Sequence, residues 1–82
     1  MIINFYSDSG HGWGEIPVSL IEELRLSNKI SNYSYRETDY AYLEEDYDLP
    51  MVLKKLKDRD IPYSFNEIPT NGDCWVRSLK RF

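Results

Sequence analysis

The stretch Asp8-Ser9-Gly10-His11-Gly12-Trp13-Gly14 decides how the rest of the chain is interpreted. It holds three of the four glycines, the single histidine and one of the two tryptophans. Glycine lets a backbone adopt conformations closed to other residues and lets another surface approach closely. A loop that also carries an imidazole and a large amphipathic ring is typical of a contact site rather than of a connector. We therefore expect these residues to form a flexible, exposed crossover.

The chain has 82 residues and a formal net charge of −4, from 14 acidic and 10 basic side chains. This length accommodates one hydrophobic core, so residues 1–82 are expected to form a single domain. The negative charge argues against nonspecific binding to nucleic acid, which depends on neutralising phosphates. A lone cysteine, Cys74, fits a reducing compartment. The sequence shows neither a long apolar run nor a signal-peptide pattern, and it therefore predicts a cytoplasmic protein with no membrane contact.

The spacing of apolar residues predicts an alternation of strands and helices. Short β-branched and aromatic runs predict strands at residues 2–6, 30–37, 40–45 and 63–68. Apolar residues at helical spacing predict amphipathic helices at about residues 17–26 and from an Asp48 cap to near Arg59. Residues 74–82 alternate weakly, which favours a final strand, and their basic side chains are typical of a solvated tail.

The predicted order is β-α-β-β-α-β with a final strand, which corresponds to a small α+β two-layer sandwich. Two helices are expected to cover one face of an antiparallel sheet, while the other face stays open. The two central strands form a hairpin through residues 37–39. If Tyr33 and Tyr35 lie beside Tyr40 and Tyr42, this hairpin carries a surface of four tyrosines.

The candidate chemical groups are few. Asp8 lies three residues before His11 and could orient its imidazole as a general base, but no signature of a nucleophile surrounds Cys74 or the nearby serines. The acidic run at residues 44–48 places neighbouring carboxylates on opposite faces of a strand and has no glycine for a calcium loop. We interpret this run as a strand end followed by a helix cap, with a docking patch for a basic partner as the alternative. We expect no catalytic residue, no metal and no cofactor.

The glycine-rich stretch matches neither a Walker loop nor a dinucleotide fingerprint, because it lacks their terminal residues and spacing. It still lies between a predicted strand and a predicted helix, so a phosphate-bearing ligand is one interpretation. A demanding crossover in which Trp13 caps the core is the other. The tyrosine face is similar to open sheets that stack bases, but acidic residues surround it and nucleic acid is not the expected partner.

Several short motifs occur in a fixed order along nearly the whole chain. They are Phe5-Tyr6-Ser7-Asp8, Gly10-His11-Gly12-Trp13, Ile30-Ser31, Tyr33-Ser34-Tyr35, Tyr42-Leu43-Glu44-Glu45-Asp46, Asp48, and Arg77-Ser78 with Phe82. In this combination the chain resembles a family of small uncharacterised phage and prophage proteins with the motifs DPGHGW, YSY, YLEEDCD and RSYxxF. Ser9 stands where that family has proline, and Tyr47 stands where it has cysteine. The resemblance implies a phage or mobile-element origin and no established activity.

The residue chemistry and the resemblance together give one candidate binding site. Its members are Asp8, His11, Trp13, Tyr33, Tyr35, Tyr42, Glu44, Glu45, Asp46 and Arg77. By analogy with small acidic phage proteins that block host proteins, we expect an accessory protein that binds a host macromolecule, above all a protein. The contact would involve the Gly-His-Gly-Trp loop and the acidic, tyrosine-rich hairpin.

Three other interpretations stay open. The tyrosine face is also suited to self-association as a homodimer. A site for a small ligand or nucleotide around Asp8 and His11, with or without catalysis, is the alternative function. A structural component of a virion is a third.

Overall fold

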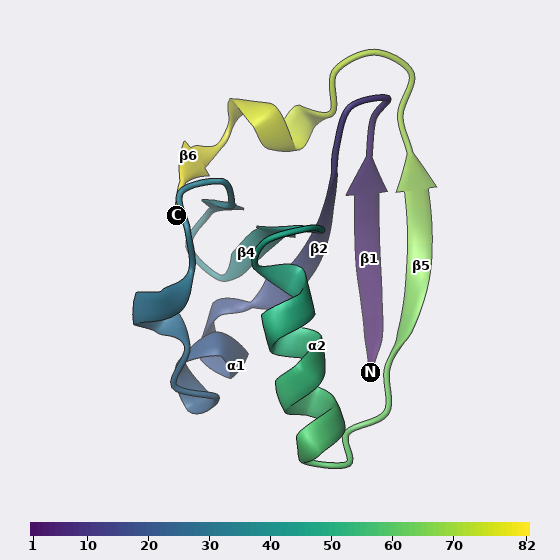
Figure 1. Cartoon of the computed structure of the whole chain (residues 1–82). Coiled ribbons are helices and arrows are strands. Elements are labelled where there is room, and N and C mark those ends of the chain that lie inside the picture. The colour runs from purple at the N-terminus through teal and green to yellow at the C-terminus, as the bar shows by residue number, and fades with distance from the viewer.

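A six-stranded sheet in the order β5-β1-β2-β4-β3-β6 organises the computed structural model, which describes residues 1–82 (Figure 1). The elements in chain order are β1 (Ile2–Ser7), β2 (Gly12–Pro17), α1 (Val18–Glu23), the 3-10 turn η1 (Ser27–Lys29), β3 (Tyr35–Arg36), β4 (Tyr40–Glu44), α2 (Leu49–Asp58), β5 (Ser64–Pro69), the 3-10 turn η2 (Trp75–Ser78) and β6 (Lys80–Arg81). The predicted α+β class is confirmed. No helix combines the length and the apolar composition that crossing a bilayer requires.

The glycine-rich stretch differs most from its prediction, because half of it is a strand. Asp8 N donates to His11 O over 2.9 Å, which closes a tight turn, and β2 then begins at Gly12. β2 pairs antiparallel with both β1 and β4. The expected flexible crossover is therefore wrong: residues 8–11 are a hairpin turn, and residues 12–14 lie in the middle of the sheet.

The glycines of β2 serve close packing rather than backbone freedom. Gly72 is the one glycine with a positive φ, so Gly12 and Gly14 adopt backbone angles open to other residues. A Cβ at Gly14 would lie 2.7 Å from Leu49 Cδ1, and a Cβ at Gly12 would overlap the Phe5 ring. The missing side chains let α2 and Phe5 lie directly against the strand.

The sheet is mixed, whereas an antiparallel sheet was predicted. β5 runs parallel to β1, from Ile2 opposite Ser64 to Ser7 opposite Pro69. This arrangement arises because α2 and the segment after it return the chain to the end of the sheet at which β1 starts (Figure 1). The predicted central hairpin is much shorter than expected, since β3 has two residues and Tyr33 lies outside it.

Both helices cover the same face of the sheet, as predicted. Their apolar side chains join those of β1, β2 and β4 in an eleven-residue core: Ile3, Ile16, Val18, Ile21, Leu24, Leu26, Ala41, Leu43, Leu49, Val52 and Leu56. Each fully buried aliphatic side chain of this kind contributes about 1.5–3 kcal/mol. α1 ends earlier than predicted, because Arg25 adopts a left-handed φ of 60°. α2 ends at Asp58, close to the predicted Arg59.

The second face of the sheet is covered, although it was expected to stay open. A smaller core of Trp13, Tyr35, Tyr42, Cys74 and Val76 fills it. The cover is the C-terminal segment, which forms η2 and then β6 instead of one continuous strand (Figure 1). Large rings on one side of a small sheet would leave an extended apolar surface, and η2 removes most of it from water.

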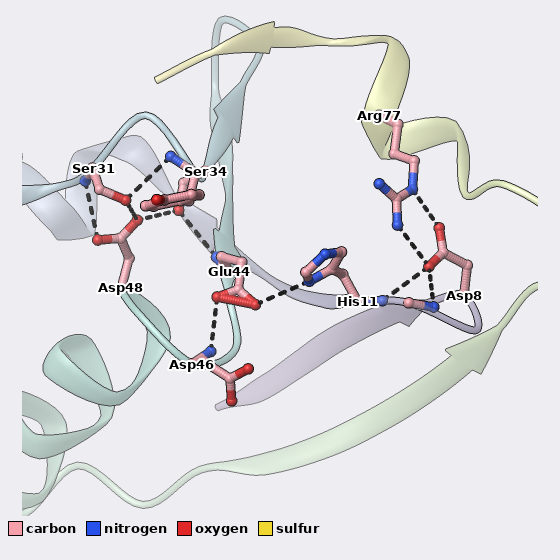
Figure 2. Close-up of polar contacts among 10 residues, drawn as sticks. Asp8, His11, Ser31, Ser34, Glu44, Asp46, Asp48 and Arg77 are labelled. Atoms are coloured by element: carbon pink, nitrogen blue, oxygen red, sulfur yellow. Dashed lines mark hydrogen bonds and ion pairs between the residues drawn. The ribbon is translucent and has the colours of Figure 1, made fainter.

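Asp48 precedes α2 as predicted, but its side chain makes no capping hydrogen bond. The carboxylate instead accepts hydrogen bonds from Ser31 N over 3.0 Å, from Ser31 Oγ over 2.7 Å and from Ser34 Oγ. Ser34 Oγ in turn accepts a hydrogen bond from Glu44 N over 3.0 Å (Figure 2). This buried network fixes the loop before β3 to both ends of the turn between β4 and α2.

Candidate functional site

Asp8 anchors the candidate site through five hydrogen bonds to its carboxylate. The backbone N–H groups of Gly10, His11 and Cys74 donate over 3.0 Å each, and Arg77 donates through Nε over 2.6 Å and Nη2 over 3.0 Å. The Asp8 side chain is only 2% exposed. Hydrogen bonds from the Arg77 guanidinium, and then from the Cys74 backbone, hold the pKa of Asp8 well below its ordinary value. Asp8 thus joins the hairpin turn to η2 as a carboxylate that is charged at neutral pH.

Two arginines of the C-terminal segment lie over aromatic rings. Arg77 Cζ lies 5.1 Å from the centre of the Trp13 ring, and Arg81 Cζ lies 4.9 Å from the centre of the Tyr35 ring. Arg81 Nη1 donates to Asn32 O over 2.9 Å, and no carboxylate lies within ion-pair distance of its guanidinium. Stacking on an aromatic face orients a guanidinium and leaves its edge free for a ligand.

The carboxylate beside the imidazole of His11 belongs to Glu44, not to Asp8. His11 Nδ1 lies 3.6 Å from Glu44 Oε1, whereas Asp8 receives a hydrogen bond from the His11 backbone (Figure 2). The interpretation in which Asp8 orients the His11 imidazole as a general base, which the sequence left open, is therefore wrong. Glu44 is 3% exposed; Asp46 N donates to its Oε2 over 3.0 Å, and its Oε1 has no hydrogen-bond partner.

These side chains surround a pocket of about 300 Å³ on the face that η2 covers. Its lining residues are His11, Trp13, Tyr33, Tyr35, Glu44, Tyr47, Arg77 and Arg81. Tyr33 and Tyr47 stack with ring centres 4.4 Å apart and an interplanar angle of 13°. Both rings are more than half exposed, so they form an open aromatic rim. The pocket thus combines an aromatic wall, two guanidinium groups, an exposed imidazole and a buried carboxylate.

Most of the predicted site residues meet at this pocket, but Trp13 does so as a buried wall. Its side chain is 2% exposed, and its indole Nε1 has no hydrogen-bond partner. The exposed indole contact is therefore wrong, whereas the alternative interpretation, in which Trp13 caps the core, agrees with this burial. Asp8 does not line the pocket, but its carboxylate holds Arg77 in place.

Tyr42, Glu45 and Asp46 were also predicted to belong to the site, and they do not line the pocket. Tyr42 is buried, and its hydroxyl lies 3.0 Å from Glu15 Oε2 and 2.9 Å from Glu37 Oε1. Burial, and then these hydrogen bonds, raise the pKa of Tyr42. Because Tyr35 and Tyr42 are both buried, the predicted four-tyrosine surface is wrong.

The two carboxylates after β4 are exposed. Glu45 lies at a shallow hollow on the other face, which Phe5, Leu49, Phe65 and Glu67 also line. Partial burial, and then the charges of Asp46 and Glu44, raise the pKa of Glu45. This turn therefore concentrates negative charge next to the pocket.

Two pocket residues were missed by the sequence interpretation. Tyr47 attracted attention only as a departure from the family motif, and Arg81 was assigned to a solvated tail. Arg81 reaches the pocket through the pairing of β6 with β3, which places it opposite Tyr35. Short edge strands of this kind carry too little local pattern to be recognised before the sheet is known.

Comparisons of the chain with protein families, curated proteins and solved structures return no match. The function is therefore inferred from the pocket itself.

Proposed function

We propose that this chain is a binding protein whose pocket takes a small ligand with an anionic group, a phosphate or a carboxylate. The observation that carries the proposal is how the two guanidinium groups are partnered and oriented. Asp8 fixes Arg77, while Arg81 has no carboxylate partner, and both lie over aromatic rings of the same pocket. A guanidinium with a free edge recognises carboxylate and phosphate oxygens with paired hydrogen bonds.

A small ligand suits the pocket better than a nucleic-acid chain. Its volume of about 300 Å³ lies at the lower end of the range for ligand sites. The net charge of −4 and the acidic turn beside the pocket oppose a polyanion, whose repulsion grows with each additional phosphate. The buried Glu44 carboxylate also favours a ligand that carries a hydrogen-bond donor next to its anionic group.

Binding of a host protein is the second candidate, and the exposed Tyr33–Tyr47 pair favours it. Stacked tyrosines give rigid contact area with polar tips, which is common in protein interfaces. Since Trp13 is buried, such a partner would have to insert an acidic side chain between Arg77 and Arg81. A phage origin, a cytoplasmic location and homodimerisation stay predictions from the sequence.

Tryptophan fluorescence gives a direct test. Trp75→Phe leaves Trp13 as the single tryptophan, so quenching then reports on the pocket wall. In this variant we expect inorganic phosphate or AMP to quench the Trp13 fluorescence, and the quenching should saturate as the ligand concentration rises. Arg81→Ala should weaken the binding by about tenfold or more, the loss of one charge-assisted hydrogen bond. Lys80→Ala is the matched control, because it removes the same charge from the neighbouring residue, which does not line the pocket.

Equal weakening by Arg81→Ala and Lys80→Ala would mean that only general electrostatic attraction is at work. Failure of both probes to saturate at about 10 mM would remove the small-ligand proposal. Capture of an acidic protein partner that depends on Arg81 but not on Lys80 would instead support the second candidate.

A further inference from the structure

The turn after β4 holds three carboxylates that no lysine or arginine neutralises. One oxygen from each of Glu44, Glu45 and Asp46 lies within 4.8 Å of the others. His11 Nδ1 is the one basic nitrogen within 4.0 Å of these carboxylates, and no other ion pair involves these residues. Glu45 and Asp46 are exposed, and exposed carboxylates are common without a bound ion, so it is Glu44 that indicates a cation.

Glu44 distinguishes this cluster from an ordinary acidic surface. Its side chain is 4% exposed, and Oε1 points toward His11 without a hydrogen-bond partner (Figure 2). A carboxylate oxygen that is buried and unpaired costs several kcal/mol, and native proteins rarely tolerate it without a ligand or ion.

The distance between His11 Nδ1 and Glu44 Oε1 fits two ligands of one metal ion better than a direct contact. At 3.6 Å it is too long for a hydrogen bond. Two atoms that each lie about 2.0–2.2 Å from the same ion, with a tetrahedral angle between them, are about 3.3–3.6 Å apart. The backbone of His11 is already held by Asp8, so the imidazole is presented from a fixed position.

We propose that His11 Nδ1 and Glu44 Oε1 are two ligands of a site for Zn²⁺ or a similar divalent transition metal. His11 lies outside the cluster that Glu44 forms with Glu45 and Asp46, so the exposed side chains of Glu45 and Asp46 complete the site by rotating toward the ion. One imidazole among carboxylates favours such an ion over Mg²⁺ and Ca²⁺, which prefer oxygen ligands alone. Nothing in the spacing of the sequence demands this site, because the histidine and the acidic run lie more than thirty residues apart. The bound ion adds positive charge to the wall of the pocket, so the site goes beyond the proposed function without depending on it.

Calorimetric titration of ZnCl₂ into metal-free full-length protein tests the site, and Co²⁺ absorption bands give a second readout of ligand geometry. We expect one ion per chain, with a dissociation constant in the micromolar range. His11→Ala and Glu44→Gln should each weaken Zn²⁺ binding by about tenfold or more, whereas Glu23→Gln, an exposed carboxylate on α1, should not. His11 is half exposed, so His11→Ala keeps the test valid if Glu44→Gln perturbs folding.

Unchanged Zn²⁺ affinity in His11→Ala, or no binding at about 1 mM Zn²⁺, would overturn the metal site. Equal binding of Mg²⁺ and Zn²⁺ would do the same, because it would show that the imidazole contributes nothing. The phosphate and AMP titrations are run in EDTA, so the anion site is tested on metal-free protein, and the Zn²⁺ titration is run without phosphate or AMP. Failure of the metal site is therefore distinguishable from failure of the anion site.

Discussion

Trp13 on β2 lies directly opposite Glu44 on β4. Each of these buried side chains carries one polar atom without a hydrogen-bond partner, the indole Nε1 and the carboxylate Oε1. Neighbouring unsatisfied groups of opposite hydrogen-bonding character in a pocket wall are typical of a site that completes its bonds with a ligand. The same feature makes the unliganded protein less stable than its packing would allow.

Glu44→Gln is expected to raise the stability of the protein although it weakens the binding of Zn²⁺. Glutamine keeps the acceptor that Asp46 N needs and removes the buried charge, so the free energy of unfolding at pH 8 should increase by about 1 kcal/mol. Urea denaturation measures this change. Glu23→Gln, on the exposed side of α1, should leave the free energy of unfolding within about 0.5 kcal/mol of the original value. Lower stability in Glu44→Gln would show that the carboxylate is already neutralised within the protein.

Asp8→Asn is expected to lower the stability of the protein at neutral pH. The stability of the variant should also fall less steeply as the pH is lowered. The pKa of Asp8 is lowered in the folded protein, so its contribution is present above the unfolded value of about 3.9 and is lost as the pH falls toward the lower folded value. The original protein should therefore lose stability below about pH 4 more steeply than the variant. Denaturation curves at several pH values check this. Asp58→Asn, which removes a carboxylate paired only with Lys54 on the surface of α2, should follow the original curve.

Asp48→Ala is expected to be among the most damaging substitutions outside the apolar cores. It leaves Ser31 N, Ser31 Oγ and Ser34 Oγ without their acceptor in a buried position, which costs about 2–4 kcal/mol. A helix cap alone would cost about 1 kcal/mol, so the size of the loss separates the two roles. Thermal unfolding gives the comparison, with Asp39→Ala as an exposed control. A loss near 1 kcal/mol would contradict the role of Asp48 in the buried network.

Local pattern was sufficient for the two helices and for β1, β4 and β5. The apolar spacing of residues 49–56 alone specifies α2, and the left-handed φ of 56° at Asp60 follows its predicted end. β2 was not predicted as a strand, because its glycines and Pro17 are residues that favour turns. Its strand conformation comes from pairing with β1 on one side and β4 on the other, and such pairing leaves little trace in a short segment. The parallel pairing of β5 depends likewise on contacts about sixty residues apart.

The site was predictable in its residue types but not in its geometry. Asp8, His11 and Arg77 stand out as chemistry-bearing residues, yet nothing local pairs Asp8 with Arg77 or His11 with Glu44. Those partners are set by the register of β2 against β4 and by the position of η2. For the same reason the sequence could not decide between an exposed Trp13 and a Trp13 that caps the core. Its burial depends on a C-terminal segment that returns from sixty residues away.

Gly14→Ala separates the two roles that glycine could have in the opening stretch of the sequence. If close packing is the reason, a Cβ at 2.7 Å from Leu49 Cδ1 overpacks the core and costs about 1–3 kcal/mol. Leu49→Ala removes the opposing atoms, so Gly14→Ala should cost much less in that background, and the double-mutant cycle should show coupling of about 1 kcal/mol or more. Backbone freedom predicts no coupling, because the strand conformation is the same whether or not Leu49 is present. Additive losses of stability in the cycle would therefore restore flexibility as the reason for the glycine and refute its packing role.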